Sequence, residues 1–485
     1  MSTHQPAPAG ERRTYAEALA AIETRGRYGI RLGLGRVRAL LRELGNPETA
    51  VRGALVAGTN GKGSVIALAG SALRAAGYRV GETPKPHLVT YRERIVVDGR
   101  PIAAADFARL VDEVLPIADR ISRRLGPPTE FELLTALMFR HFAEARLDVA
   151  LVEVGLGGRL DATNAWDGGV AVLTNVGLDH TDRLGTTIEA IAREKSAIVK
   201  RGDVAATGAS GEALAILRRR CARMGVPLAV APPAPLLTWN RDALTVDLPR
   251  LGPTEVALRG RHQAANAAVA DALLDSLEAA GIATVPADAR RRGYATARWA
   301  GRLELVTVPA GEGHAQIERG TSPERGTPGP GTPGTAPGRE VLLDGAHNPD
   351  GAAALATALD DLRPHLEAGP LTLVWASMAD KDVDGTLLAA AAAAALRDGT
   401  PAEAPAIVCT TIPDLPRALP AEDLAARWRA VLPQARVVTA QDPAAALDAA
   451  LRESRGPVVV AGSLYLVGAA RARLVDDPAL RDPEA

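Results

Sequence analysis

Short apolar segments alternate with Ala- and Leu-rich segments along most of this 485-residue chain. The apolar segments read GALVAG, DVALVEVG, GVAVLTNVG and DVAATG in the first part, and EVLLDGA, LTLVWAS, AIVCTTI, ARVVTA and PVVVAGS in the later part. Continuous apolar strands separated by helices are typical of parallel sheets covered on both faces. Because the chain is also longer than one core usually organises, we predict an α/β fold with two tandem doubly wound domains.

The division of the chain is predicted near ATARWAGRLELV, after a long helical stretch. We expect a disordered lead over residues 1–13, a first domain over 14–298 and a smaller second domain over 299–485. The segment GTSPERGTPGPGTPGTAPG, at 320–338, is too rich in Gly, Pro and Thr to pack a core. It predicts a flexible insert at about 310–338 within the second domain, without a catalytic role.

Composition excludes several classes of protein. A formal net charge of -1 gives no reason to expect nucleic acid or an anionic membrane as partner. Cys221 and Cys409 are too few for a disulfide framework, which favours a reducing compartment. The N-terminal MSTHQPAPAGERRTY has no apolar core of a signal peptide, and LLAAAAAAAL at 387–396 is too short to cross a membrane. We expect a cytoplasmic protein.

A glycine-rich turn, in ALVAGTNGKGSVIALAGSAL, lies between a predicted strand and an amphipathic helix. Backbone N–H groups of such a turn and the positive end of the helix form an anion site. Lys62 adds a mobile cation, and Ser64 adds a hydroxyl that can reach Mg²⁺. The usual P-loop pattern ends G-K-[S/T], whereas here Gly63 separates the two residues. The alternative is a tight turn with a solvated lysine.

Two later strands end in polar side chains. Glu153 ends DVALVE, while Asp179 and His180 follow GVAVLTNVG. Since the carboxyl ends of adjacent parallel strands meet at one crevice, Glu153 and His180 are expected to lie near the phosphates held by the glycine-rich turn. A carboxylate and an imidazole suit a divalent cation that also binds phosphate. The alternative is that each caps a helix or pairs with an arginine.

Lysine is rare in the chain. Of 56 Lys plus Arg residues, only five are lysine: Lys62, Lys85, Lys195, Lys200 and Lys381. Lysine can lose its proton when buried, whereas arginine stays charged. A neutral lysine amine adds carbon dioxide to give a carbamate, an anion able to ligate Mg²⁺. Lys195, in REKSAIV, directly follows Glu194, at a position where arginine would serve any plain surface role. It is therefore the lysine for which a carbamate is considered.

A series of motifs carries a family resemblance. In order they are GTNGKGS, PHLVTYRERI, EVGLGGRLDATN, LDHTDRLG, REKSAIV, GRHQAANAA, GRLE, LLDGAHNPDG, DKD and AGSLYLVG. With these motifs the chain strongly resembles folylpolyglutamate synthase and dihydrofolate synthase, a branch of the muramyl-ligase superfamily, from about residue 14 to about 474. The GLGGRLDATN and DGAHNP stretches are the most specific.

The resemblance implies an activity and a set of site residues. Such enzymes use ATP and Mg²⁺ to phosphorylate a carboxylate of a folate or dihydropteroate, and glutamate then attacks the acyl phosphate. The first domain would be a P-loop ATPase-like, Mur-ligase-like central domain, and the second a Rossmann-like glutamate-ligase domain. The implied ATP-binding residues are Gly58, Thr59, Asn60, Gly61, Lys62, Gly63, Ser64, Asn266, Arg302 and Asp344. The implied magnesium ligands are Ser64, Glu153 and His180, and the implied catalytic residues are Lys62, Lys195 and His180.

The substrate residues follow from the same resemblance. Those for the pteroate or folate are Ile30, Arg31, Leu32, Thr129, Glu130, Phe131, Glu132, Leu160, Asp161 and Ala162. His347 and Ser463 are the candidates for glutamate, although His347 can instead serve the phosphates and Ser463 can simply end a strand. A site drawn from both domains implies closure over small-molecule substrates. We expect a monomer without a nucleic-acid or membrane partner.

Two positions matter within the resemblance. Lys195 falls on the family's EK position, which is known for carbamylation; the alternative is an ion pair to a phosphate or to Asp179. Relatives read T-S-P-H-L where this chain reads TPKPHL, so Lys85 replaces a serine of the magnesium environment. An ammonium does not ligate magnesium. Either one cation site is rearranged, Lys85 supplies positive charge near the phosphates, or it points to solvent.

Other functions stay open at this point. The nearest is another Mur-type amide ligase, such as a cell-wall muramyl-peptide ligase, against which RLDATN and the missing nucleotide-sugar domain argue. The alternative from another class of protein is a P-loop switch or motor. The motif DGAHNP in the predicted second domain argues against it. A glutamylation-only enzyme without dihydrofolate synthase activity is poorly separated from the bifunctional case.

Overall fold

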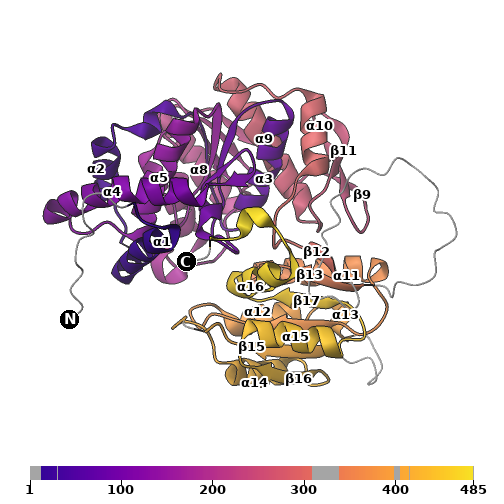
Figure 1. Ribbon diagram of the computed structural model, residues 1–485. Helices are drawn as coiled ribbons and strands as arrows, with labels where there is room; N and C mark the ends of the chain where they lie inside the picture. The colour runs from indigo at the N-terminus through magenta and orange to yellow at the C-terminus, as the bar shows by residue number, and fades with distance from the viewer. Residues whose placement is uncertain (1–11, 30, 309–337, 398–404, 414, 484–485) are drawn as a thin grey trace. The chain divides into compact units, whose positions relative to one another are not determined.

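The computed structural model describes residues 12–29, 31–308, 338–397, 405–413 and 415–483, which form two compact units (Figure 1). The chain up to Ala234, Ala265–Thr296 and the segment from Ala479 belong to unit 1. Pro235–Ala264 and Ala297–Pro478 belong to unit 2. The predicted α/β fold class is confirmed. The predicted insert, except its last residue, and residues 1–11 of the predicted lead lie outside the described residues.

Unit 1 is built on an eight-stranded sheet in the order β4-β3-β2-β5-β1-β6-β7-β8. Its strands are β1 (Gly53–Ala57), β2 (Val80–Thr83), β3 (Val96–Val97), β4 (Arg100–Pro101), β5 (Val149–Glu153), β6 (Gly169–Leu173), β7 (Val204–Thr207) and β8 (Leu228–Val230). Six of these strands run parallel, and β3 and β4 add an antiparallel edge. Every residue of β1 and β5 is buried, which explains why both read as continuous apolar runs.

Helices cover this sheet on both faces. They are α1 (Tyr15–Glu23), α2 (Gly35–Glu43), α3 (Lys62–Ala75), α4 (Ala104–Leu125), α5 (Glu130–Ala145), α6 (Thr181–Leu184), α7 (Ile188–Ser196), α8 (Gly211–Met224), α9 (Gln263–Ala279) and α10 (Ala287–Thr296). Leu55 and Ala57 of β1 belong to the core formed with α1, α2, α4, α5, α7 and α8. Ala54 and Val56 point to the other face, where α3 packs against β1 and α10.

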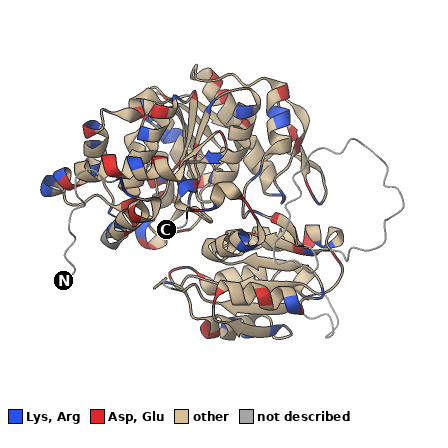
Figure 2. Ribbon diagram, in the orientation of Figure 1, with Lys and Arg blue, Asp and Glu red and all other residues tan. Residues whose placement is uncertain are grey.

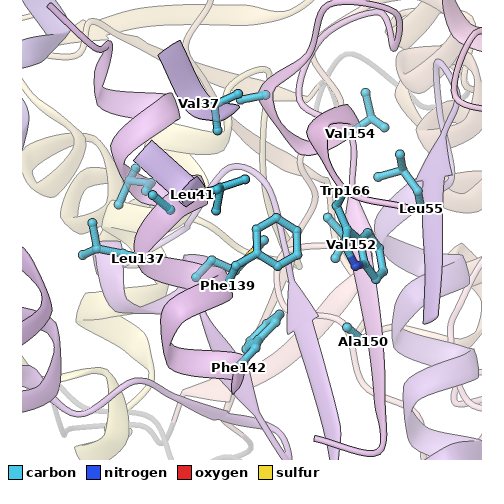
Figure 3. Close-up of a cluster of buried hydrophobic side chains, with 14 of the residues drawn as sticks. Val37, Leu41, Leu55, Leu137, Phe139, Phe142, Ala150, Val152, Val154 and Trp166 are labelled. Carbon is cyan, nitrogen blue, oxygen red and sulfur yellow. The ribbon is translucent and has the colours of Figure 1, made fainter. Parts of the chain in front are cut away.

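The core of unit 1 brings α2, α5, β1 and β5 together (Figure 3). Leu41 and Leu137 are 1% and 0% exposed. The rings of Phe139 and Trp166 lie 5.6 Å apart, and the Trp166 indole donates to the Val51 carbonyl oxygen at 3.0 Å. This packing fixes β5 against β1, so that the ends of the two strands lie side by side.

Unit 2 contains two sheets. The larger has six strands, in the order β12-β13-β17-β14-β15-β16: β12 (Glu304–Val308), β13 (Arg339–Leu343), β14 (Thr372–Trp375), β15 (Ala406–Thr410), β16 (Arg436–Ala440) and β17 (Val458–Ala461). Only β12 is antiparallel to its neighbour within this sheet. The smaller sheet is an antiparallel meander of β9 (Leu236–Trp239), β10 (Leu244–Leu248) and β11 (Gly252–Val256). The meander was not predicted from the sequence.

Alternating residues of the larger sheet face two sets of helices. Leu373 and Trp375 belong to the core formed with α11 (Pro349–Leu362), α12 (Val383–Ala390), α13 (Ala394–Arg397) and α14 (Ala421–Val431). The opposite face carries α15 (Pro443–Glu453) and α16 (Leu464–Leu474), which pack against each other. Unit 2 is therefore doubly wound, as predicted.

Charged side chains of both signs lie along the helices of each unit, while the strands carry few (Figure 2). Both cysteines are buried and free. Over the part of the chain that the structure describes, no helix is long and apolar enough to span a bilayer.

Candidate active site

The glycine-rich turn leads from β1 into α3. Gly58 has φ +153° and Gly61 has φ +81°. A Cβ atom at Gly58 would lie 1.8 Å from the Thr174 hydroxyl oxygen, and one at Gly61 would lie 2.3 Å from the Asn266 side-chain oxygen. Glycine at both positions thus lets the backbone of the turn pass close to Thr174 and Asn266, where a larger residue would clash. Lys62, Gly63 and Ser64 form the first turn of the 14-residue helix.

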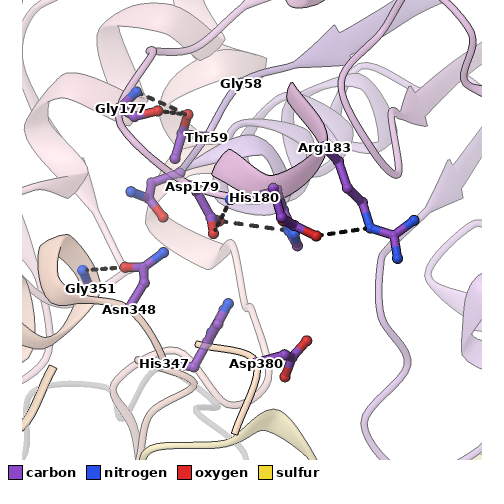
Figure 4. A network of polar contacts seen from close by, with 12 residues as sticks. Gly58, Thr59, Gly177, Asp179, His180, Arg183, His347, Asn348, Gly351 and Asp380 are labelled. Carbon is purple, nitrogen blue, oxygen red and sulfur yellow. Dashed lines mark hydrogen bonds and ion pairs between the residues drawn. The ribbon is translucent and has the colours of Figure 1, made fainter. Parts of the chain in front are cut away.

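A neighbouring loop holds this turn in place (Figure 4). The Thr59 N–H donates to the Asn175 carbonyl oxygen at 3.1 Å, and the Asn60 N–H donates to the Asn175 side-chain oxygen at 2.9 Å. The Thr59 hydroxyl donates to the Gly177 carbonyl oxygen at 3.2 Å and accepts from the Gly177 N–H at 3.0 Å. The Thr59 side chain and the Asn60 backbone therefore lie within a network that shapes the turn.

Lys62 bends back over its own turn. Its Nζ donates to the carbonyl oxygens of Gly58 and Thr59, at 3.0 and 3.1 Å, and lies 3.9 Å from Glu153 Oε1. Glu153 ends β5 and is 4% exposed. The predicted proximity of Glu153 to the glycine-rich turn is confirmed by this contact.

Lys195 reaches the same turn from α7. Its Nζ donates to the Gly58 carbonyl oxygen at 2.9 Å, and the residue is only 6% exposed. Burial lowers the pKa of the Lys195 ammonium to about 7, with a further contribution from the positive charge of Lys62, against the opposing charge of Asp179. A substantial fraction of the amine is therefore neutral near pH 7.

The GLGGR segment positions α7. The Arg159 N–H donates to the Glu194 carbonyl oxygen at 3.0 Å, and the Arg159 guanidinium pairs with the Glu194 carboxylate at 2.8 Å. A Cβ atom at Gly158 would lie 2.8 Å from that same carbonyl oxygen and 3.0 Å from the Lys195 carbonyl oxygen. Sequence reasoning missed this role, for which the paired glycines were the only signal.

Lys85 is turned inward, so the alternative that it points to solvent is wrong. Its Nζ donates to the Glu153 carbonyl oxygen at 2.5 Å and lies 4.4 Å from the centre of the Phe131 ring. Its backbone N–H donates to the Glu153 carboxylate at 3.2 Å. Burial lowers the pKa of Lys85 to about 8 against the opposing charges of Asp161 and Glu153. The ammonium thus lies between Glu153 and α5.

A pocket opens where these strands end. Its lining residues are Gly58, Thr59, Lys62, Val154, Gly155, Leu156, Gly157, Asp179, His180 and Lys195. His180 has a left-handed backbone (φ +50°), and its N–H donates to the Asp179 carboxylate at 2.8 Å (Figure 4). The His180 imidazole Nε2 lies 3.8 Å from the same carboxylate. The pocket combines a polar turn, two lysines, a carboxylate and an imidazole.

The residues predicted to hold magnesium suit that ion. Ser64 and Glu153 supply the hard oxygen donors that Mg²⁺ prefers, and the ion usually keeps several waters, so two protein ligands are enough. Both are buried, at 6% and 4% exposed, while the His180 side chain is 43% exposed at the pocket. Within the described residues, no three or more His, Cys, Asp or Glu side chains form a metal cluster. Two buried oxygen donors and a partly exposed imidazole are therefore the groups that would hold the ion.

The three predicted pteroate segments lie together in unit 1. The Gly33 N–H, next to Leu32, donates to the Leu160 carbonyl oxygen at 3.4 Å. The Arg36 guanidinium pairs with the Glu132 carboxylate at 2.9 Å. Arg31 is exposed and Ala162 is buried. Ile30, also predicted for this site, lies outside the described residues.

Several of these residues have structural roles. Thr129 and Glu132 form the capping box of α5, so their polar groups serve the helix. The Asp161 carboxylate accepts from the N–H groups of Gly155 and Leu156, at 3.0 and 2.9 Å, and so shapes the loop after β5.

Glu130 and Phe131 face other partners. Glu130 accepts from the Tyr91 hydroxyl at 3.1 Å. Phe131 contacts Lys85, and a Cβ atom at Gly155 would lie 3.0 Å from its ring.

The remaining predicted residues include Asn266 of α9, whose side-chain oxygen lies beside Gly61 as described above, and residues of unit 2. The Asp344 carboxylate, 8% exposed, accepts from the Leu303 and Ala346 N–H groups, both at 2.9 Å. Burial raises the pKa of Asp344, and the charge of Arg302 opposes this.

The two glutamate candidates lie at the carboxyl end of the unit 2 sheet. His347 Nδ1 lies 2.7 Å from the Gly345 carbonyl oxygen. Ser463 is 2% exposed, and its hydroxyl caps α16 by accepting from the Tyr465 N–H at 3.2 Å. Asn348 likewise caps α11 (Figure 4).

Family models match both units. The "Mur ligase middle domain" matches residues 56–222, and the "Mur ligase, glutamate ligase domain" matches residues 333–464. The dihydrofolate synthase/folylpolyglutamate synthase of Bacillus subtilis is 35% identical over 378 residues, which cover 76% of this chain and 80% of the relative. The enzyme of the same name from Mycobacterium tuberculosis is 33% identical, covering 92% and 90%. This chain belongs to the folylpolyglutamate and dihydrofolate synthase family of Mur ligases.

Solved structures of the family agree with this result. The Mycobacterium tuberculosis folylpolyglutamate synthase complexed with ADP and AMPPCP has a TM-score of 0.76 and 31% identity, covering 96% of this chain and 100% of that one. Escherichia coli FolC in complex with DHPP and ADP has a TM-score of 0.74 and 29% identity, covering 96% and 98%. The resemblance to this family that the sequence motifs carry is therefore confirmed.

Proposed function

We propose that the chain is an ATP-dependent ligase that adds L-glutamate to folates, and also to dihydropteroate, through an acyl phosphate. One observation carries the proposal: three of the five lysines converge on the ends of β1 and β5. Lys62 and Lys195 both donate to the Gly58 carbonyl oxygen, and Lys85 donates to that of Glu153. Phosphoryl transfer depends mainly on positioned positive charge, and this arrangement supplies it.

The glycine-rich turn is the proposed site of the ATP phosphates. Phosphate oxygens would replace the carbonyl oxygens of Gly58 and Thr59 as acceptors of the Lys62 ammonium, which needs only a rotation of its side chain. Ser64, Glu153 and His180 are the proposed magnesium ligands, and magnesium would neutralise charge on the transferred phosphoryl group. Asn266, Arg302 and Asp344 are the proposed further contacts to the nucleotide.

The reaction then has two steps. A carboxylate oxygen of the pteroate or folate attacks the γ-phosphorus, and the bond to ADP breaks. The glutamate amine next attacks the acyl carbon, loses a proton and releases inorganic phosphate. Lys195 is proposed to act as a carbamate, which its buried and partly neutral amine favours.

The substrate residues are proposals of the same kind. Residues 30–32, 129–132 and 160–162 would bind the pteroate or folate, because the described members of these segments adjoin one another next to the pocket loop. Within them, Phe131 and Glu130 are better placed for contact than Thr129 and Glu132, whose polar groups cap α5. His347 and Ser463 are the proposed glutamate residues. We further propose a cytoplasmic monomer without a nucleic-acid partner.

The test is a comparison of substrates with purified enzyme. ADP release is measured with dihydropteroate and with a reduced folate, each with and without L-glutamate, and the product is identified by mass spectrometry. Glutamate-dependent product from both acceptors supports the bifunctional proposal, whereas product from the folate alone supports the glutamylation-only alternative. ATP turnover that needs neither substrate would indicate a nucleotide switch instead.

A further inference from the structure

The carboxyl edge of the larger sheet in unit 2 has a crevice-forming topology. Strand β17 lies between β13 and β14. The helices that follow β13 and β14, α11 and α12, pack together on one face of the sheet. The helix that follows β17, α16, packs against α15 on the other face. Where connections leave neighbouring strands toward opposite faces, open α/β sheets bind ligands.

Arg417 is held over this edge by its backbone. It lies in the loop between β15 and α14, and its carbonyl oxygen accepts from the Ala379 N–H at 2.8 Å. Two residues later the Leu419 N–H donates to the Ser377 carbonyl oxygen at 2.9 Å. These bonds fix the loop after β15 to the loop after β14.

The Arg417 guanidinium connects the two sides of the crevice. One terminal nitrogen lies 3.1 Å from the Asp380 carboxylate, in the loop after β14. The other donates to the Tyr465 hydroxyl at 3.1 Å, in the first turn of α16. The Arg417 side chain is nevertheless 44% exposed. Because a guanidinium has five N–H donors, an arginine held in this way keeps donors available for an incoming carboxylate.

The surroundings of Arg417 favour an anion. The N-terminal ends of α11 and α16 lie at this edge and carry partial positive charge. The Gly462 N–H donates to the Ala346 carbonyl oxygen at 2.9 Å, which joins the loops that carry Ser463 and His347. The two residues predicted for glutamate therefore share this edge with Arg417.

We propose that Arg417 binds one of the two carboxylates of the incoming glutamate, oriented for this by Asp380 and Tyr465. The inference rests on the proposed ligase function and adds a residue that determines the choice of amino acid. It explains why a surface arginine has two orienting partners on opposite sides of a crevice.

The first test compares two arginines of unit 2. Arg417→Ala is expected to raise the KM for glutamate about ten- to a hundredfold, the loss typical of a charged hydrogen bond, with kcat and the KM values for ATP and folate within about threefold. Arg417→Lys keeps the charge but loses the planar fork, and an intermediate rise is expected. Arg436→Ala is the control, because Arg436 pairs with Glu453 at the opposite edge of the sheet.

The second test removes a carboxylate from the substrate instead. L-Glutamine lacks the γ-carboxylate, and L-isoglutamine lacks the α-carboxylate. If Arg417 binds one of them, the preference of the enzyme for glutamate over that amide falls at least about tenfold in Arg417→Ala. An unchanged preference over both amides, or a glutamate KM within about twofold of the parent, overturns the inference. A parent enzyme that ligates no glutamate at all refutes the proposed function itself.

Discussion

Replacement of Lys195 by methionine tests the burial of an ionisable amine in the pocket. Methionine has a similar length and no charge. The parent side chain is 6% exposed, and its one described hydrogen bond goes to the Gly58 carbonyl oxygen. Removing the amine therefore removes one hydrogen bond together with the free-energy cost of a buried positive charge.

The size of the stabilisation expected for Lys195→Met follows from the pKa of Lys195. Burial lowers the pKa of Lys195 from 10.5 to about 7, and one pKa unit corresponds to about 1.4 kcal/mol, so the ammonium is disfavoured by roughly 5 kcal/mol. Relaxation of the pocket and the lost hydrogen bond, worth about 1 kcal/mol, reduce this to about 3 kcal/mol of expected stabilisation in Lys195→Met at pH 7. For a unit of this size, that is a rise in Tm of roughly 6 °C.

The expected stability difference between Lys195→Met and the parent changes with pH in a definite direction. Between pH 7 and 10.5 the unfolded chain holds a proton that the folded chain has released, so the stability of the parent rises with pH in this window. The advantage of Lys195→Met is thus largest at or below pH 7 and vanishes above the unfolded pKa.

The assay is thermal unfolding of both proteins at several pH values, without bicarbonate, with Lys381→Met in unit 2 as the control. A variant no more stable than the parent at pH 7, or a difference that does not shrink with rising pH, would refute the reasoning.

Activity separates a charged from a carbamylated Lys195. Lys195→Arg keeps the charge, and we expect it to be nearly inactive, because a guanidinium forms no carbamate. Lys195→Ala is expected to regain some activity with added short carboxylates. Bicarbonate is expected to raise the Tm of the parent but not the Tm of the Lys195 variants. A fully active Lys195→Arg would contradict the carbamate proposal. An unmodified Lys195 amine in a well-resolved map of active enzyme crystallised with bicarbonate would also contradict it.

Three further predictions concern other parts of the chain. Lys62→Ala is expected to fold normally, by its Tm, and to lose ligase activity about a thousandfold; activity within tenfold of the parent would contradict this. Deletion of residues 318–336 is expected to leave Tm and turnover nearly unchanged, because Val308 and Arg339 on either side of the insert are paired in a β-ladder and a short turn can join them. Lys85→Ser is expected to add one metal ion to those bound with a non-hydrolysable ATP analogue, counted by titration calorimetry; equal counts would show that Lys85 displaces no metal.

Sequence reasoning reached the sheets and the glycine-rich turn because their signals are local. Buried parallel strands must be apolar throughout, so β1 and β5 can be recognised in the sequence as continuous apolar segments. A turn in which Gly58 and Gly61 have positive φ values leaves its mark in the glycines themselves. The resemblance then supplied residues that no local signal identifies, such as Asn266 and Arg302.

Sequence reasoning missed local features as well as long-range contacts. The meander of β9 to β11 pairs strands that are neighbours in sequence, and β10 alternates in burial, but β9 and β11 carry exposed residues that weaken the pattern. The inward direction of Lys85 depends on Glu153 and Phe131, which follow it by 68 and 46 positions. Asp161 belongs to a motif of the family, yet its carboxylate serves the backbone of its own loop, and only the fold shows this.

The most direct test of the central claim follows one oxygen atom. Dihydropteroate or folate labelled with oxygen-18 in the reacting carboxylate is incubated with enzyme, ATP, Mg²⁺ and L-glutamate, and the inorganic phosphate is examined by mass spectrometry. If the carboxylate attacks the γ-phosphorus and the amine then displaces phosphate, one labelled oxygen passes to each phosphate released. Phosphate without label, formed while glutamate is being ligated, would contradict the acyl-phosphate mechanism. Phosphate release that needs neither dihydropteroate nor folate would contradict the ligase assignment.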